Sequence, residues 1–180
     1  MKKATESLYL EIIAECKTLF EKKSKDYGTA WRILRLPSIT DQILIKAQRI
    51  RSIQEKGSQK VEDDVRGEFI GIINYSLIAL IQLQLTEKDP VELPWEVLEP
   101  KYDQAAAATL SLLQNKNHDY GEAWRDMRIS SITDIILMKL FRVKQIEDNA
   151  GSTLVSEGVD ANYQDMINYA VFCLIKMNEA

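Results

Sequence analysis

The sequence has few residues of the kinds that form disulfide bonds or catalytic sites, such as cysteine and histidine. Its 180 residues include two cysteines, one histidine, four prolines and seven glycines. Cys16 and Cys173 fall inside apolar helical patterns, so we expect buried thiols and no disulfide framework. His118 stands where the related stretch described below has Lys25, which argues against a shared catalytic histidine. Zinc-ligand spacing, a phosphate-binding glycine loop and a nucleophile constellation are also missing.

The sequence also lacks a strong excess of charge and a targeting segment. Its net charge is −4, which argues against nucleic-acid binding through bulk positive charge, and 46% hydrophobic residues suffice for a core. The N-terminal pattern is amphipathic and carries Glu11 and Glu15, unlike the apolar centre of a signal peptide. The apolar run at 70–85 is expected to be too short and too interrupted to span a bilayer. We therefore expect a soluble, cytoplasmic protein that does not bind membranes.

What the sequence does contain is an internal repeat. Three segments match their second copies, in these pairs: 23–32 with 116–125 (KSKDYGTAWR and KNHDYGEAWR), 38–49 with 131–142, and 73–75 with 167–169. The identities include polar residues that packing alone would not need. These repeated polar positions are therefore the candidates for function.

Apolar residues recur at helical spacing throughout, and no stretch shows the alternation typical of a strand. Each repeat is predicted to hold three helices, and the third is apolar nearly all round, as at 69–85. We expect a first repeat at 1–86, a proline-rich connector at 87–100 and a second repeat at 101–180. The predicted fold is all-α: two tandem three-helix repeats packed as a pseudo-twofold helical bundle, with the third helices against each other.

An aspartate stands in the last turn of the first helix of each repeat, at Asp26 and Asp119. A carboxylate there meets the unfavourable end of the helix dipole, so another group must compensate for it. One alternative is a hydrogen bond to a backbone amide or to the repeated arginine pairs, Arg32 with Arg35 and Arg125 with Arg128. The other is contact with a metal or substrate, in which case Arg32 and Arg125 are predicted to bind phosphate. The sequence leaves both alternatives open.

The second helix of each repeat carries a basic pair, Lys46 with Arg49 and Lys139 with Arg142. Residues three apart share a helix face. Such a pair suits phosphate oxygens, because arginine donates in a bidentate manner and lysine supplies a point charge. The alternative is a structural salt bridge, to the third helix or to the repeated aspartates of the same helix, Asp41 and Asp134.

The third helices place an asparagine in apolar sequence, at Asn74 and Asn168. A buried amide without partners costs about 1–3 kcal/mol, so both are predicted to be buried and hydrogen-bonded. Asp165 lies one turn before Asn168, whereas the first repeat has Gly71 there and Glu68 one turn further back. Carboxylate and amide oxygens facing a lysine and an arginine are typical of a Mg²⁺ site with a phosphorylated substrate. A structural polar network is the alternative.

The set Lys-x-x-Asp-Tyr-Gly, Lys-x-x-Arg and Asp-x-x-Asn-Tyr resembles a bacterial and phage helical family of unknown function that gene context links to nucleotide modification. The resemblance covers both repeats. A weaker similarity leads to the all-α nucleoside triphosphate pyrophosphatases of the MazG and dimeric dUTPase type, and it implies a MazG-like bundle that holds Mg²⁺ between acidic residues. The sequence departs from that pattern, because the second helices have no Glu-x-x-Glu and the third helices have no Glu-x-x-Asp. In addition, Ile45 and Met138 precede the second-helix lysines, where an acid is often found.

Two functions follow as hypotheses. In the first, the protein binds a nucleotide or nucleoside triphosphate and hydrolyses it with Mg²⁺ between the α and β phosphates. The metal ligands would be Asp119, Asp134, Asp165 and Asn168, so under this hypothesis the second repeat carries the metal, although the sequence leaves open which repeat is active. In the second, the protein is a non-catalytic nucleotide- or protein-binding helical module. A homodimer is compatible with either.

Overall fold

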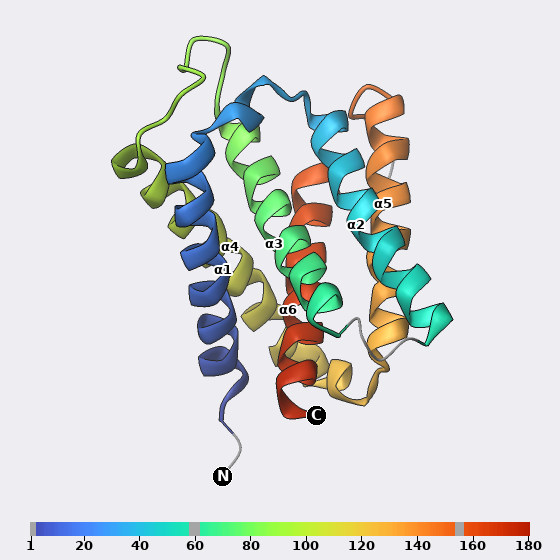
Figure 1. Cartoon of the computed structure of the whole chain (residues 1–180). Coiled ribbons are helices and arrows are strands. Elements are labelled where there is room, and N and C mark those ends of the chain that lie inside the picture. Colours follow the sequence, from blue (N-terminus) through green and yellow to red (C-terminus); the bar gives the residue numbers. More distant parts are fainter. Residues whose placement is uncertain (1–2, 58–61, 154–156) are drawn as a thin grey trace.

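The computed structural model describes residues 3–57, 62–153 and 157–180, without the side chains of 62–64 and 118–120. Within these residues the fold is all-helical and contains no strand, as predicted (Figure 1). Both repeats contain the same elements in the same order. They are α1 (Thr5–Tyr27), η1 (Ala30–Ile33), α2 (Leu36–Lys56) and α3 (Glu62–Gln84), followed by α4 (Trp95–Tyr120), η3 (Ala123–Asp126), α5 (Ile129–Asp148) and α6 (Val159–Glu179).

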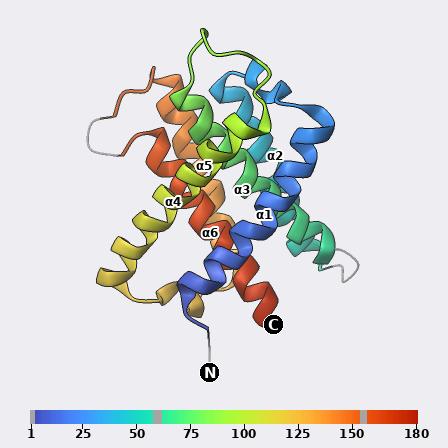
Figure 2. The ribbon, with the colours of Figure 1, turned by 90° about the vertical axis from the view of Figure 1, so that its left-hand side faces the viewer.

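The third helices, α3 and α6, pack against each other at the centre of the molecule, as predicted (Figure 1). Helix α2 packs on α3, α5 packs on α6, and α2 also contacts α5, so these four helices form a bundle. Helices α1 and α4 contact each other and both central helices. Figure 2 shows α1 and α4 in front of the bundle, on the side away from α2 and α5.

Two buried asparagines connect the repeats. Asn74 in α3 and Asn168 in α6 are 8% and 5% exposed. The Tyr102 hydroxyl donates to Asn74 Oδ1 over 2.9 Å, and the Tyr9 hydroxyl donates to Asn168 Oδ1 over 2.8 Å. Each amide nitrogen donates to a backbone carbonyl in the first helix of its own repeat, at Cys16 and at Thr109. The predicted burial and hydrogen bonding are confirmed, and each tyrosine bond runs from one repeat to the other.

The first helix of the second repeat begins earlier than predicted. Helix α4 starts at Trp95, so the end of the expected connector 87–100 is helical. Pro100 removes one amide donor from the helix, and for this reason the sequence pattern places the start after it. However, Leu98 is fully buried and Trp95 packs on Phe20 of α1, with the ring centroids 6.2 Å apart. Tertiary packing thus outweighs the low helix propensity of proline.

The apolar stretch of α3 has the length and composition of a membrane span, contrary to the expectation from the sequence. Val65–Gln84 meets both criteria. Of its apolar window, 61% is buried inside the protein, where α3 packs on α2 and α6. A helix that is apolar nearly all round is typical both of a protein core and of a membrane span, and the burial of α3 is consistent with the core of a soluble protein.

A second set of hydrogen bonds joins α5 to α2. The Thr40 hydroxyl lies 2.6 Å from Glu147 Oε1 and 2.6 Å from the Tyr163 hydroxyl, while Gln54 donates to Thr133 over 3.0 Å. Thr40 and Thr133 are equivalent in the two repeats, and Glu147 stands at the position equivalent to Gln54. Burial raises the pKa of Glu147, and hydrogen bonds from Thr40 and Tyr163 offset this only in part.

Glu147→Gln is expected to stabilise the fold at neutral pH. A carboxyl whose pKa is raised by folding stabilises the protein when protonated, and this contribution is lost as the pH rises through the folded-state pKa. An amide keeps the acceptor oxygen without the buried charge, so Tm at pH 7 should rise by on the order of 2–4 °C, with no gain at pH 4. Thermal unfolding at both pH values measures this. Gln54→Glu is the matched control and should lower Tm at pH 7; a Tm unchanged by Glu147→Gln would contradict the prediction.

Candidate functional site

The first repeat contains a cavity of about 440 Å³ at its repeated motif, between the end of α1, η1, α2 and α3. Its walls combine cations, aromatic rings and a residue without a side chain: Lys23, Lys46, Tyr27, Trp31, Tyr75 and Gly71. Within the described part of the chain, no aspartate, glutamate, histidine or cysteine lines it. The cavity therefore offers positive charge and flat apolar surface to a ligand.

Gly28 ends α1 and redirects the chain toward the cavity. Gly28 has φ +65° and ψ −149°, which glycine adopts readily and other residues only with strain. Gly121 has nearly the same conformation at the end of α4, with φ +66° and ψ −151°. The turn places Tyr27, which is 74% exposed, and the partly buried Trp31 beside the cavity. Tyr27, Gly28, Ala30 and Trp31 of the repeated motif thus form one wall.

Lys46 reaches the cavity by crossing α3 at Gly71. A Cβ atom there would lie 2.8 Å from the Lys46 Cδ and Cε, so the glycine makes room for this path. The ammonium lies 5.6 Å from the centroid of the Tyr75 ring, within cation–π range. It is 3.5 Å from Glu68 Oε2, whereas Arg49 binds Glu68 Oε1 at 2.6 Å. Arg49 is thus the main partner of Glu68, and Lys46 remains 26% exposed.

Lys23 is the second cation of the cavity. It is exposed near the end of α1, and it makes no hydrogen bond or ion pair with any residue that the structure describes. Two residues later on the same helix, Lys25 is paired with Glu21 at 2.9 Å. The cavity therefore presents two lysines without a carboxylate between them.

In the second repeat, an aspartate holds the equivalent lysines together. Asp165 stands at the position of Gly71 and is 5% exposed. Its two oxygens accept hydrogen bonds from Lys116 at 2.6 Å and from Lys139 at 3.0 Å. Burial lowers the pKa of Lys116, but the hydrogen bond and charge of Asp165 outweigh it and hold the pKa above its ordinary value. Lys139, predicted to bind phosphate, is therefore already paired.

The aromatic side chains also fill the site in the second repeat and leave it open in the first. Trp124 stands at the position of Trp31, is 5% exposed, and stacks on Phe172 with ring centroids 4.3 Å apart and planes 3° apart. Phe172 takes the place of Ile78, which lines the first-repeat cavity. In the second repeat, the Phe172 ring thus fills the region that is open beside Trp31 in the first repeat.

The predicted metal ligands whose side chains the structure describes, Asp134, Asp165 and Asn168, do not form one site. Both oxygens of Asp165 are bound by lysines, and Asn168 is used by the hydrogen bonds between the repeats. Asp134 is exposed on α5, 3.6 Å from Arg51 of α2. The side chain of Asp119 lies outside the described residues. Among the residues described, no group of three or more His, Cys, Asp or Glu side chains could hold a metal ion.

The other repeated acids lie on the surface. Asp41 is exposed on α2 and binds Lys144 of α5 at 2.6 Å. Asp26 is exposed at the end of α1 and has no hydrogen bond or ion pair to a described residue. The alternative in which Arg32 compensates Asp26 is therefore not found among the described residues.

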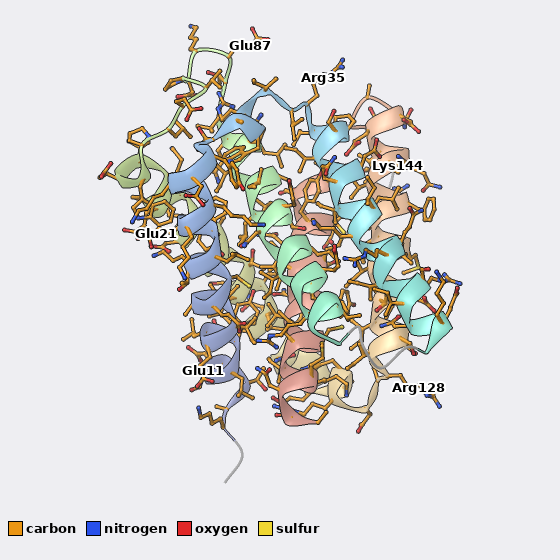
Figure 3. The ribbon with its side chains drawn as sticks, in the orientation of Figure 1. Glu11, Glu21, Arg35, Glu87, Arg128 and Lys144 are labelled. Carbon is orange, nitrogen blue, oxygen red and sulfur yellow. The ribbon has the colours of Figure 1, made fainter. Side chains whose placement is uncertain are left out.

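Arg32 is predicted to bind phosphate, but it forms hydrogen bonds to the connector between the repeats instead. Its guanidinium binds the side chain of Gln82, and it donates to the backbone carbonyls of Thr86, Asp89 and Pro90. Arg35 and the equivalent Arg128 point into solvent at opposite ends of the bundle (Figure 3). In the second basic pair, Arg142 contacts Gln145 on its own helix at 3.5 Å.

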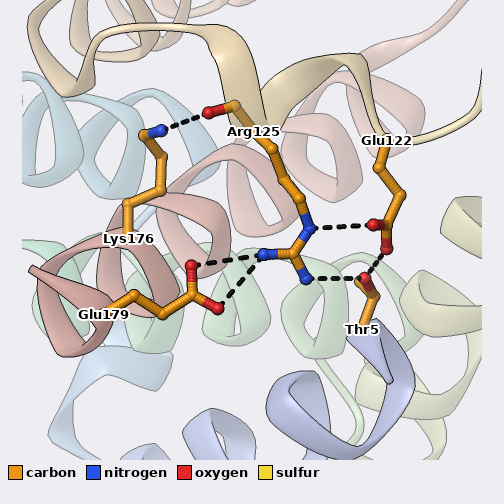
Figure 4. A network of polar contacts seen from close by, with 5 residues as sticks. All are labelled: Thr5, Glu122, Arg125, Lys176 and Glu179. Carbon is orange, nitrogen blue, oxygen red and sulfur yellow. Dashed lines mark hydrogen bonds and ion pairs between the residues drawn. The ribbon is translucent and has the colours of Figure 1, made fainter. Parts of the chain in front are cut away.

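Arg125, the counterpart of Arg32, joins the two ends of the chain (Figure 4). It donates to Glu122 at 2.8 Å, to Glu179 at 3.1 Å and to Thr5 at 3.2 Å. Its carbonyl accepts from Lys176 at 2.7 Å, and its guanidinium lies over the Trp124 ring. Because these partners occupy the guanidinium, the predicted phosphate contact of Arg125 is replaced by a structural role.

Lys23 and Lys116 are central to the two sites but absent from the predicted site residues. They begin the two copies of the motif, and their identity in both copies is the signal that points to them. Tyr27 and Tyr75 are likewise absent from the prediction, and both have an identical residue in the other repeat.

A family model described as nucleotide modification associated domain 1 matches the chain in two segments, residues 23–83 and 116–177. The first contains Lys23, Lys46 and Gly71, and the second contains Lys139 and Asp165. No curated protein and no solved structure matches the chain. Because the two segments together cover more than half of its length, the chain belongs to the nucleotide modification associated domain 1 family, with two copies of the domain in tandem.

Proposed function

We propose that the protein binds a nucleotide in the first-repeat cavity. The observation that carries this proposal is the joint presence, at one cavity, of two lysines that no carboxylate bridges and of four aromatic side chains, Phe20, Tyr27, Trp31 and Tyr75. A nucleotide has the complementary features, a phosphate anion and a planar base. The description of the family as associated with nucleotide modification supports the same class of ligand.

The dimensions and exposure of the cavity suit this ligand. A volume of about 440 Å³ falls within the range of small-molecule sites. The phosphate would lie near Lys23 and Lys46, where it gains charge-assisted hydrogen bonds. The base would lie along Trp31, with Tyr27 at the edge of the cavity and exposed to contact a ligand.

The cavity supports binding more than Mg²⁺-dependent hydrolysis. Mg²⁺ is usually bound through one or two carboxylates, and none lines the described cavity. The side-chain oxygen of Asn74, which also lines it, already accepts from Tyr102. These residues do not fit a Mg²⁺ site, so the proposed function is that of a non-catalytic nucleotide-binding module.

We extend the proposal to the arrangement and location of the protein. A MazG-like pseudo-twofold bundle is supported by contacts that occur twice at equivalent positions, the tyrosine to asparagine bonds and the bonds of Thr40 and Thr133. A cytoplasmic location is supported by the two buried free thiols, Cys16 and Cys173, which suit a reducing compartment.

Isothermal titration with nucleoside mono- and triphosphates, with and without Mg²⁺, tests the function. We expect one nucleotide per chain, bound equally well without Mg²⁺. The same nucleotide should raise Tm, because a ligand that binds only the folded state stabilises it. Absence of binding by every nucleotide would refute the proposal, and binding with turnover only in Mg²⁺ would favour the hydrolase hypothesis instead.

Lys23→Ala combined with Lys46→Ala is expected to weaken nucleotide binding by at least about 100-fold, because each charge-assisted contact contributes about 1.5–3 kcal/mol. Lys25→Ala is the matched control, since Lys25 lies on the same helix, is exposed and pairs with Glu21. It should leave the affinity unchanged. Equal affinity of the double variant and the natural chain would show that the lysines do not contact the ligand.

A further inference from the structure

Two positions on the third helix distinguish the open repeat from the filled one. Gly71 and Ile78 on α3 correspond to Asp165 and Phe172 on α6. The members of each pair are seven residues apart, which is about two helical turns, so they lie on the same face. Gly71 and Ile78 both line the cavity of the first repeat. The larger side chains of Asp165 and Phe172 therefore add atoms to the equivalent face of α6 in the second repeat.

Asp165 supplies an oxyanion to the second repeat. Its side chain is 7% exposed, and one oxygen binds Lys116 while the other binds Lys139. The equivalent lysines of the first repeat, Lys23 and Lys46, both line the cavity and have no carboxylate at position 71. A ligand oxyanion above Gly71 would restore to them the contacts that Asp165 makes.

Phe172 supplies a planar ring to the second repeat. It lies parallel to Trp124 at 4.3 Å, a stacked arrangement that an aromatic base adopts equally well. In the first repeat Trp31 lines the cavity beside the shorter Ile78. A planar ring placed against Trp31 would therefore fill the space that Phe172 fills in the other copy.

We infer that the second repeat is a closed copy of the ligand site, in which Asp165 occupies the place of the ligand's oxyanion and Phe172 the place of its ring. The inference rests on the proposed function for the identity of the ligand. It assigns the nucleotide phosphate to the position above Gly71 and the base to the face of Trp31. The two anchoring positions are separated by about 10 Å of helix, a span bridged by the sugar and phosphate of a nucleotide. Each chain therefore binds one nucleotide.

Gly71→Asp tests the inference by closing the open site. The new carboxylate should pair with Lys23 and Lys46, so nucleotide affinity should fall more than 100-fold while Tm is unchanged or higher. The Lys46 atoms near position 71 belong to the flexible part of its side chain, and Lys139 shows that a lysine and an aspartate coexist there in the other repeat. Gly71→Asn is the control of equal size without charge, and it should lose clearly less affinity. Equal loss in both variants would overturn the oxyanion assignment.

Asp165→Gly with Phe172→Ile tests the inference in the opposite direction by opening the second site. Titration with the nucleotide that binds the natural chain should then give two sites per chain, and adding Gly71→Asp should leave one. A folded variant that still binds one nucleotide would overturn the inference. If this variant does not fold, the comparison of Gly71→Asp with Gly71→Asn decides.

The failure of this inference is distinguishable from failure of the proposed function. A natural chain that binds no nucleotide refutes both, whereas one that binds a nucleotide with undiminished affinity after Gly71→Asp refutes the inference alone. Titration with inorganic phosphate and with the free nucleoside separates the two halves of the ligand. Phosphate should lose its binding in Gly71→Asp, while the weaker binding of the nucleoside should be reduced less.

Discussion

Replacement of both Lys116 and Lys139 by methionine is expected to lower the free energy of unfolding by about 3–5 kcal/mol, the cost of leaving a buried carboxylate without its partners. The Asp165 side chain is 7% exposed, and these two lysines are its ion-pair partners. Methionine keeps an apolar stem like that of lysine, so the decrease in the free energy of unfolding is due mainly to the lost charges. Denaturation in urea measures the change. Addition of Asp165→Asn should restore most of the stability, because the amide carries no charge.

The same double replacement in the first repeat, at Lys23 and Lys46, provides the control. We expect a loss of less than about 1 kcal/mol, as for partly exposed charges, together with loss of nucleotide binding. Equivalent lysines would thus have a structural role in one repeat and a binding role in the other. Equal destabilisation by the two double replacements would contradict this division.

Asn168→Ala is expected to destabilise the protein by about 3 kcal/mol or more, because it leaves the buried Tyr9 hydroxyl without a partner and removes the hydrogen bond from the amide to the Thr109 carbonyl. A small cavity in the core adds to the cost. Asn74→Ala should have a similar effect through Tyr102 and Cys16. Chemical denaturation monitored by far-ultraviolet circular dichroism measures both.

A double-mutant cycle separates the hydrogen bond from the packing. Tyr9→Phe combined with Asn168→Ala should cost clearly less than the sum of the single changes, because removing both partners leaves no unsatisfied group between them. Tyr9→Phe combined with Asn74→Ala should be additive, since Tyr9 bonds Asn168 and not Asn74. Coupling in the second pair but not in the first would mean that the tyrosines do not cross between the repeats.

The fold is largely predictable from the sequence because its signals are local. Helical periodicity identifies the helices, and the nearly uniform apolar surface at 69–85 identifies a buried third helix. The asparagines are predictable too, because an amide within an apolar helix requires a partner. The early start of α4 cannot be predicted in this way, because it depends on the packing of Trp95 against Phe20, a residue far away in the sequence.

The state of the site is not predictable, because it depends on contacts between distant segments. Asp165 looks like a metal ligand beside Asn168 in the sequence, and this favours an active second repeat. In the structure, Lys116 of α4 reaches Asp165 together with Lys139 of α5, and the carboxylate is fully used. The cavity lies in the first repeat, where position 71 is a glycine. The prediction that the second repeat carries the metal site is untested, and the cavity favours the first repeat as the binding site.

The crossed bonds between tyrosine and asparagine have a consequence for the origin of the molecule. The first repeat alone contains both partners, Tyr9 and Asn74, and so does the second, with Tyr102 and Asn168. Two separate copies of one repeat would thus have the groups needed to bond each other in the same way. The tandem chain therefore has the organisation that fusion of two copies of a dimer-forming repeat would produce. Fusion lets the two halves diverge, so that one pocket can be filled from within while the other stays open.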